Sequence, residues 1–420
     1  MYNLRTVLSR LSIYRQLAED QVLQNLGRAV DAVLEAPARN LEAVDRFQQA
    51  MFQLWEQGLS YPDHILDLIL FDDNPFSRIA EHCAEKQLGQ GLRQAVQADL
   101  DLLYELIHLD LRRLAQQMGI EVIILPETVP GARVLELEMA GNLAASQYWP
   151  GCLEQLIAHY SRNFRGTVGR YGALRWDSQC GLVGVEHPEA VALEDLIAYQ
   201  SQKEQVCSNT ERFLHGYPAN HILLYGPRGT GKSSLVKALR QRYWQEGLRL
   251  VELAREDLHS MSRVVEVLQG YAARFILFID DLSFEDYETQ YKGFKAALEG
   301  SLQSRPQNML VYATSNRRHL IREFFSDRKV TDEEVHGQET MQEKLSLADR
   351  FGLNITFPAP NQQLYLEMVE KMARKQGIVM DPEVLRRRAL EWERLRHGPS
   401  GRTARQFVDS LDRKYYPEHE

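Results

Sequence analysis

One glycine-rich stretch near the middle of the chain constrains the fold more than any other feature. It fits the pattern G-x-x-x-x-G-K-[ST] at every fixed position and consists of Gly226-Pro227-Arg228-Gly229-Thr230-Gly231-Lys232-Ser233. Glycines let backbone N–H groups converge on a phosphate without Cβ obstruction, and a helix beginning near Lys232 adds its positive N-terminal dipole. We predict that this loop and Ser234 hold the phosphates of ATP. Lys232 would bridge the β- and γ-phosphates, and Ser233 would bind Mg²⁺.

The sequence on either side of the loop supports this prediction. Residues 221–225 form an apolar run typical of a buried strand, and residues 234–243 have the pattern of a helix. A strand, a phosphate loop and a helix in this order are the context that the motif requires. The alternative is a glycine turn with a chance lysine, and this context argues against it.

A second apolar run ends in two carboxylates. Residues 275–279 are followed directly by Asp280 and Asp281. In a parallel sheet, such a strand brings its carboxyl end to the edge where ligands bind, beside the phosphate loop. Asp280 is then predicted to hold Mg²⁺, directly or through water, and Asp281 to polarise the attacking water, with Glu285 as the alternative base. Without the phosphate loop, the same residues would indicate only a strand leading into a polar turn.

A third apolar run, residues 310–314, leads to Asn316. An amide at the tip of the neighbouring strand could orient the lytic water and sense the γ-phosphate. The alternative is that Asn316 caps a following helix.

Two arginine positions come later in the chain. Arg350 precedes the last candidate strand, residues 353–357, while Arg402 and Arg405 lie at the head of the final helix. A guanidinium group offers a fixed fork for phosphate oxygens and stabilises charge that develops during phosphoryl transfer. Taken singly, each would be interpreted as a surface arginine, and local pattern leaves Arg402 and Arg405 as alternatives for one role.

Together these motifs resemble the AAA+ ATPase superfamily over residues 181–420. Their order is that of Walker A, Walker B, sensor 1, arginine finger and sensor 2. Residues 348–352 are similar to the arginine-finger motif of the Holliday-junction branch-migration ATPase. The wider pattern resembles a bacterial family of AAA+ proteins known only as a domain of unknown function, through residues 209–213, 225–234, 279–284, 313–318 and 401–408.

The resemblance implies an α/β fold, a P-loop αβα sandwich with a parallel sheet and a C-terminal helical lid. It also implies ATP at the junction with the lid and assembly into a ring or partial ring, a homo-oligomer. Arg350 would then act on the ATP of a neighbouring subunit, and Arg402 on that of its own chain.

Composition limits the remaining possibilities. The 420 residues carry a formal net charge of −9, which argues against a simple electrostatic nucleic-acid binder. Four scattered cysteines suggest neither disulfides nor a zinc site. No run approaches the ~20 apolar residues of a membrane helix, and no secretory signal is recognised, so we expect a cytoplasmic protein without a membrane partner.

Three domains are expected. Residues 1–180 are predicted to be mostly helical, with candidate strands at 121–125 and 134–139 and an exposed loop at 166–172. Residues 181–360 form the nucleotide domain, and residues 361–420 form the lid, whose first helix is 364–376. The N-terminal domain has no readable chemistry and is the natural place for partner recognition.

The leading function is an Mg²⁺-dependent ATPase that remodels or loads a macromolecular partner. The alternative is a slowly hydrolysing switch or scaffold, because Asp281 stands where Glu is usual. A small-molecule kinase is disfavoured, because no lid motif for a phosphoryl acceptor is recognised. The partner is an unknown protein or a nucleic acid; basic candidates are residues 317–319, Arg322 and 386–388. Tyr291, Lys292 and Phe294 could grip a substrate in a pore, or pack within an ordinary helix.

Overall fold

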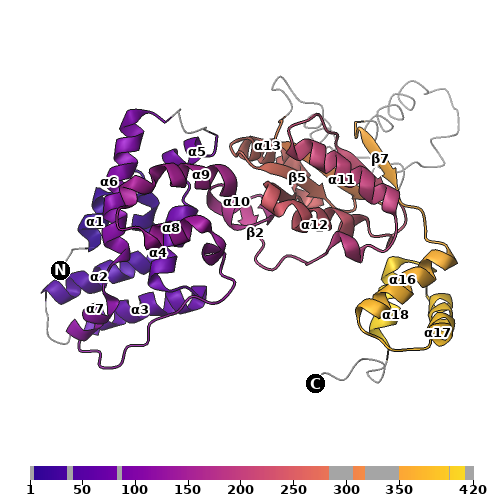
Figure 1. Cartoon of the computed structure of the whole chain (residues 1–420), viewed down its shortest axis with the longest axis horizontal. Helices are drawn as coiled ribbons and strands as arrows, with labels where there is room; N and C mark the ends of the chain where they lie inside the picture. Colours follow the sequence, from indigo (N-terminus) through magenta and orange to yellow (C-terminus); the bar gives the residue numbers. More distant parts are fainter. Residues whose placement is uncertain are drawn as a thin grey trace, which may run out of the picture. The chain divides into compact units, whose positions relative to one another are not determined.

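The computed structural model describes residues 4–35, 41–82, 88–282, 306–316, 350–396 and 398–411. These residues belong to two compact units (Figure 1). Unit 1 comprises residues 1–170 together with the short segment 270–272, and unit 2 comprises residues 171–269 and 273–420.

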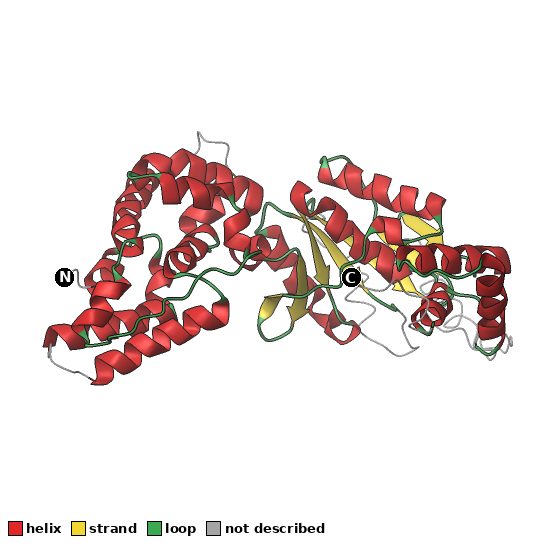
Figure 2. Ribbon diagram, turned by 60° about the horizontal axis from the view of Figure 1, so that its bottom comes forward, coloured by secondary structure: helices red, strands yellow, loops and turns green. Residues whose placement is uncertain are grey.

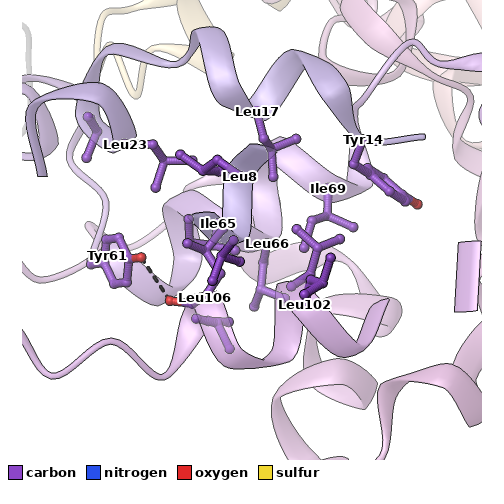
Figure 3. Close-up of a cluster of buried hydrophobic side chains, with 14 of the residues drawn as sticks. Leu8, Tyr14, Leu17, Leu23, Tyr61, Ile65, Leu66, Ile69, Leu102 and Leu106 are labelled. Carbon is purple, nitrogen blue, oxygen red and sulfur yellow. Dashed lines mark hydrogen bonds between the residues drawn. The ribbon is translucent and has the colours of Figure 1, made fainter. Parts of the chain in front are cut away.

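Unit 1 consists of helices over its described residues. They are α1 (Leu4–Arg10), η1 (Arg15–Glu19), α2 (Gln21–Glu35), α3 (Leu41–Gln57), α4 (Tyr61–Leu70), α5 (Pro75–Ala80), α6 (Gln90–Ile107), α7 (Leu111–Gln117), η2 (Arg133–Glu136), α8 (Glu138–Ala145), η3 (Trp149–Cys152), α9 (Leu153–Asn163) and α10 (Gly166–Arg170). Their apolar faces meet in one core, part of which Figure 3 shows. Within it the Tyr61 hydroxyl donates to the Leu106 carbonyl at 2.9 Å, so a buried polar group is satisfied.

Three predictions in this unit are wrong. Residues 121–125 are not a strand: Val122 and Ile124 are 78% and 73% exposed, and no neighbouring strand pairs with them. Residues 134–139 lie in η2 and α8 instead of a strand. Residues 166–172 are not an exposed loop, because they begin with helix α10, in which Val168 and Gly169 are buried. A β-branched run or a glycine cluster is ambiguous until its partners are known.

Unit 2 is built on a β-sheet, whose strands are yellow in Figure 2. The sheet has seven strands in the order β2-β1-β4-β5-β6-β3-β7. The strands are β1 (Ala173–Asp177), β2 (Gly181–Gly184), β3 (Ile222–Tyr225), β4 (Leu248–Glu252), β5 (Arg274–Ile279), β6 (Met309–Ser315) and β7 (Leu353–Thr356). All neighbours are parallel except the β1–β2 pair. The strands predicted at 221–225, 275–279, 310–314 and 353–357 are confirmed as β3, β5, β6 and β7, and so is the αβα P-loop fold class.

Both faces of this sheet are covered, as a parallel sheet requires. Helices α11 (Gln200–Leu214) and α12 (Lys232–Tyr243) pack on the face that presents Ile222 and Leu224. The alternate residue Leu223 is buried on the other face. The sequence also forms α13 (Met261–Gln269) and the short helices η4 (Leu193–Asp195), η5 (Trp244–Glu246) and η6 (Arg255–Ser260).

The sheet begins earlier than predicted. Unit 2 starts at Tyr171, ahead of the expected boundary near Gly181. The reason is that β1 pairs in parallel with β4, with Ala173 opposite Leu250, and so belongs to the sheet. Strand β1 was not predicted, because it is only five residues long and is followed by its antiparallel partner β2 and not by the helix of a βα unit.

The chain continues after β7 into a C-terminal helical subdomain. It contains α16 (Gln362–Lys375), α17 (Pro382–Arg394) and α18 (Gly401–Asp409), which matches the predicted first helix at 364–376. Asn361 and Ser400 cap α16 and α18, accepting hydrogen bonds from Leu364 N (2.8 Å) and Thr403 N (3.0 Å). These caps fix where each helix starts, and the start of α18 forms part of the site described next.

Candidate nucleotide-binding site

The glycine-rich loop connects the end of β3 to the start of α12. Gly226, Gly229 and Gly231 have φ values of 151°, 78° and 88°, which residues with a side chain rarely adopt. At Gly226 space is lacking as well, because a Cβ there would lie 2.0 Å from the Phe357 carbonyl oxygen. The loop conformation therefore depends on glycine, and it leaves the first turn of α12 open towards a ligand.

Lys232 is the buried cation of the loop. Its Nζ donates to the carbonyls of Gly226 (2.8 Å) and Pro227 (2.9 Å), and to Asn316 Oδ1 (3.3 Å). Burial lowers the pKa of Lys232, while the carboxylates of Asp280 and Asp281 oppose that shift. Loop and strand tips thus hold the ammonium group where a phosphate chain would need it.

A hydroxyl and a carboxylate meet beside the lysine. Ser233 Oγ donates to Asp280 Oδ1 at 2.6 Å, and Thr314 Oγ1 donates to the same oxygen at 2.5 Å. Thr314 is the next-to-last residue of β6 and was missed by sequence reasoning, although it lies in the run that leads to Asn316. An oxygen set of this kind suits Mg²⁺.

Asp281 and Asn316 form a second polar pair. Asp281 has φ 51°, and its backbone N–H donates to Thr314 Oγ1 at 2.9 Å. The Asn316 amide donates to Asp281 Oδ1 at 2.5 Å, and Arg228 lies 3.6 Å from the other carboxylate oxygen. Both predicted polar positions therefore lie next to the phosphate loop; Glu285, the alternative base, is outside the described residues.

A cavity of about 600 Å³ extends from these groups. The apolar part of its lining consists of Leu196, Ile197 and Ala198 together with Met368 and Met372 of α16. No motif indicated these residues, because the two sets lie far apart in the sequence. A purine ring needs this kind of surface.

The three predicted arginines have different surroundings. Arg402 and Arg405 both line the cavity. Gly401 N–H donates to the Gly229 carbonyl at 2.9 Å, and a Cβ on Gly229 would lie 3.3 Å from Arg402 Cβ, so Arg402 is beside the phosphate loop. Arg350 is not part of the described cavity lining. It precedes β7, whose Leu353 is opposite Ile222 at the start of β3, away from the phosphate loop.

The residues fit ATP and Mg²⁺ on structural grounds. The glycine cradle accommodates phosphates, Ser233 and Asp280 supply hard oxygen ligands, and the apolar end accommodates a base. Among the described residues, no helix is long and apolar enough to cross a membrane. The other partner candidates, residues 317–319, Arg322, Tyr291, Lys292 and Phe294, lie outside the described residues.

Comparisons with known proteins agree with this geometry. A family described as "Protein of unknown function (DUF815)" matches residues 169–415. Replication factor C subunit 3 of Schizosaccharomyces pombe is 30% identical over 98 residues, which are 23% of this chain and 28% of that protein. An AAA-ATPase of Arabidopsis thaliana is 29% identical over 173 residues, 34% of this chain and 32% of that protein. The chain thus spans about a third or less of these relatives.

Solved structures are similar at lower identity. A RuvB mutant of Thermotoga maritima has a TM-score of 0.38 and 15% identity, and covers 52% of this chain and 64% of its own. The RuvB Holliday junction branch migration motor of the same organism has a TM-score of 0.33 and 14% identity, and covers 55% of this chain and 75% of its own.

Proposed function

This chain belongs to the DUF815 family and has the fold of an AAA+ ATPase, and from that premise we propose that it hydrolyses ATP with Mg²⁺ in the cytoplasm to remodel or load a macromolecular partner. One observation carries the proposal: the hydrogen bond of Ser233 to Asp280, beside the buried ammonium group of Lys232. Serine hydroxyl, strand-tip carboxylate and lysine are the three groups that orient a nucleotide triphosphate for transfer.

Each group has a distinct role in this reaction. The backbone N–H groups of the loop and Lys232 bind the β- and γ-phosphates, while Ser233 and Asp280 hold the metal. Mg²⁺, when bound, neutralises charge that develops on the phosphate oxygens. Asp281 accepts a proton from the attacking water, and Asn316, which donates to Asp281, orients both.

We assign Arg350 to a neighbouring subunit's site. Its position before β7 puts it at the opposite end of the β3–β7 pair from its own phosphate loop. A guanidinium group at that position serves an ATP bound by the next copy in a ring or partial ring. Arg402, beside Gly229, serves the ATP of its own chain.

A slowly hydrolysing switch is the second candidate, and one contact pair favours it. Asp281 is shorter than a glutamate, and its two carboxylate oxygens are engaged by Asn316 and Arg228. A base held in this way reaches the attacking water less readily, so ATP would persist in the site. Nucleotide state, and not turnover, would then control the partner.

The partner is a protein or a nucleic acid bound through unit 1 or the basic clusters. Within 386–388, Arg386 already pairs with Glu370 and Glu383 of the same subdomain. Those pairs reduce the positive charge available to nucleic acid, and the net charge of −9 acts in the same direction. We therefore favour a protein partner.

The test is steady-state ATP hydrolysis with Mg²⁺ over a range of protein concentrations, for wild type, Lys232→Ala and Arg350→Ala. If each site is shared between two subunits, activity should rise more than linearly with protein concentration and should be lost in both variants. If wild type binds ATP but is no faster than Lys232→Ala when concentrated, the switch is the better account. If wild type fails to bind ATP, both candidates are wrong.

A further inference from the structure

The segment before α11 crosses from the nucleotide loop to the C-terminal helical subdomain. We call residues 191–199 the strap. Helix η4 (Leu193–Asp195) packs against α12, and a Cβ on Gly231 would lie 3.6 Å from Leu196 Cδ2. Lys203 Nζ donates to the Leu196 carbonyl at 2.8 Å and anchors the strap to α11. The strap is therefore in contact with the phosphate loop itself.

The other end of the strap belongs to two hydrophobic cores. Tyr199 packs against the sheet core, where its ring centroid lies 5.0 Å from that of Phe357, and its hydroxyl donates to the Pro358 carbonyl at 2.7 Å. Tyr199 and Ile197 also pack against the core of α16–α18, in which Ala198 is buried. A movement of the strap relative to either core would break apolar contacts.

Asp195 supplies the polar contact between the strap and the C-terminal helices. One carboxylate oxygen accepts a hydrogen bond from Lys375 Nζ at the end of α16, and the other accepts from Ala192 N–H at 3.2 Å. The pKa of Asp195 is lowered, chiefly by the Lys375 hydrogen bond, and the positive charge of Arg405 on α18 acts in the same direction. The Asp195 side chain is 21% exposed and the Lys375 side chain is 67% exposed, so water screens this ion pair in part.

Helix α18 carries two arginines one turn apart, and they have different neighbours. Arg402 lies beside Gly229 of the phosphate loop, whereas Arg405 lines the same cavity as Asp195 and its positive charge contributes to lowering the pKa of that carboxyl. Because residues three apart share a helix face, holding one fixes the other.

We infer that Asp195 is a positioning residue, which binds Lys375 so that α16 keeps Met368 and Met372 at the cavity and α18, which packs on α16, keeps Arg402 at the phosphate loop. This inference rests on the proposed ATP site. It divides the two arginines by role: Arg402 contacts phosphate, and Arg405 adds positive charge to the same cavity lining as Asp195.

The experiment measures release of a fluorescent ATP analogue from the full chain. Asp195→Asn keeps an oxygen for Ala192 N–H but removes the charge. We expect release to become about threefold to fivefold faster, the size of a partly exposed ion pair, while turnover at saturating ATP falls by a smaller factor than in Arg402→Gln, because the Arg402 side chain is still present. Glu194→Gln is the matched control, because Glu194 is the exposed neighbouring carboxylate, and it should leave release unchanged.

Further variants separate positioning from general destabilisation. The exchange Asp195→Lys with Lys375→Asp should restore slow release in part, although each single change accelerates it. Lys375→Gln should behave like Asp195→Asn and add nothing to it, Arg405→Gln should accelerate release by a smaller factor, and Arg402→Gln should lower turnover. Unchanged release in Asp195→Asn, or fully additive effects with Lys375→Gln, would overturn the inference.

A readout without nucleotide separates this inference from the proposed function. Hydrogen exchange of the α16 and α18 amides should be faster in Asp195→Asn than in wild type or Glu194→Gln, with no ATP present. If wild type does not bind the analogue, the ATPase proposal fails, and the exchange result alone decides whether Asp195 holds the helices. Equal exchange in all three proteins contradicts the inference even if ATP binds.

Discussion

The two ends of the nucleotide cavity are built in different ways. The phosphate end comes from one continuous loop and the tips of two adjacent strands, with positive φ at three glycines and hydrogen bonds of 2.5–3.3 Å around Asp280 and Lys232. The apolar end, as we call the rest of the lining, comes from side chains of the strap and α16, which belong to distant parts of the chain.

This difference indicates that the residues of the phosphate end carry out the chemistry. Charged groups in fixed geometry lose their effect if one atom is removed, because the remaining partners cannot move to replace it. Apolar contacts of flexible methionines are interchangeable, since other side chains can fill the same space. Substitutions at the two ends should therefore differ in size and in the step that they affect.

The largest effect is expected for Lys232→Ala. It removes the buried ammonium group, so hydrolysis should fall by about 100-fold or more, with weaker ATP binding. Lys371→Ala is the control, because this lysine is exposed and, among the described residues, forms an ion pair with Glu367 within α16. Steady-state assays measure the turnover of the two variants, and equilibrium titrations measure their ATP binding. Near-normal turnover in Lys232→Ala would mean that the two ends do not differ as described.

A smaller but still large effect is expected for Asp280→Asn. The amide is a poor ligand for Mg²⁺, so turnover should fall by about 10- to 100-fold, while ATP still binds. Removing Mg²⁺ with a chelator should reduce wild-type turnover to the level of this variant. If chelation slows Asp280→Asn by the same factor as wild type, this carboxylate does not hold the metal.

At the apolar end, Met368→Ala should weaken ATP binding by about fivefold to tenfold, the loss expected when a few buried CH₂ groups are removed. Turnover at saturating ATP should stay close to wild type, because the phosphates are held elsewhere. A titration with ATP and a saturation curve separate the two quantities. A loss confined to turnover would show that the apolar end takes part in the chemistry.

The smallest effect is expected for Glu189→Gln. Glu189 lines the cavity and pairs with Lys237 of α12 at 2.9 Å, but its side chain is 64% exposed. Exposed pairs contribute little, so ATP affinity should change by less than about twofold. A larger change, measured at 0.15 M salt beside Asp195→Asn, would mean that the whole length of the segment 185–199 positions the nucleotide.

The sequence predicted the residues of the phosphate end closely and those of the apolar end poorly. Gly226, Lys232 and Asp280 lie in short local patterns whose chemistry restricts the residue types, so the pattern is readable without a structure. The strap and α16 need only be apolar and adjacent, and Leu196 and Met368 look like any core residues. Residues so far apart in the chain become neighbours only in the folded structure, so the sequence does not show that they line one cavity.

The helical unit shows the same limit in another form. Residues 121–125 are rich in β-branched side chains, yet they form no strand, and among the described residues no strand pairs with them. In β1, by contrast, a short run was not recognised although β4 was there to pair with it. In both cases, whether a strand formed depended on whether another strand lay beside the segment.

The place of β1 in the sheet bears on how the nucleotide unit could be prepared by itself. A polypeptide starting at residue 181 lacks β1, so it would leave the backbone donors and acceptors along the outer side of β4 without their partners. Such an open strand invites pairing with other molecules and aggregation. A polypeptide starting at Tyr171 retains the β1–β2 hairpin and covers that side, which makes it the better choice for crystallisation or solution work.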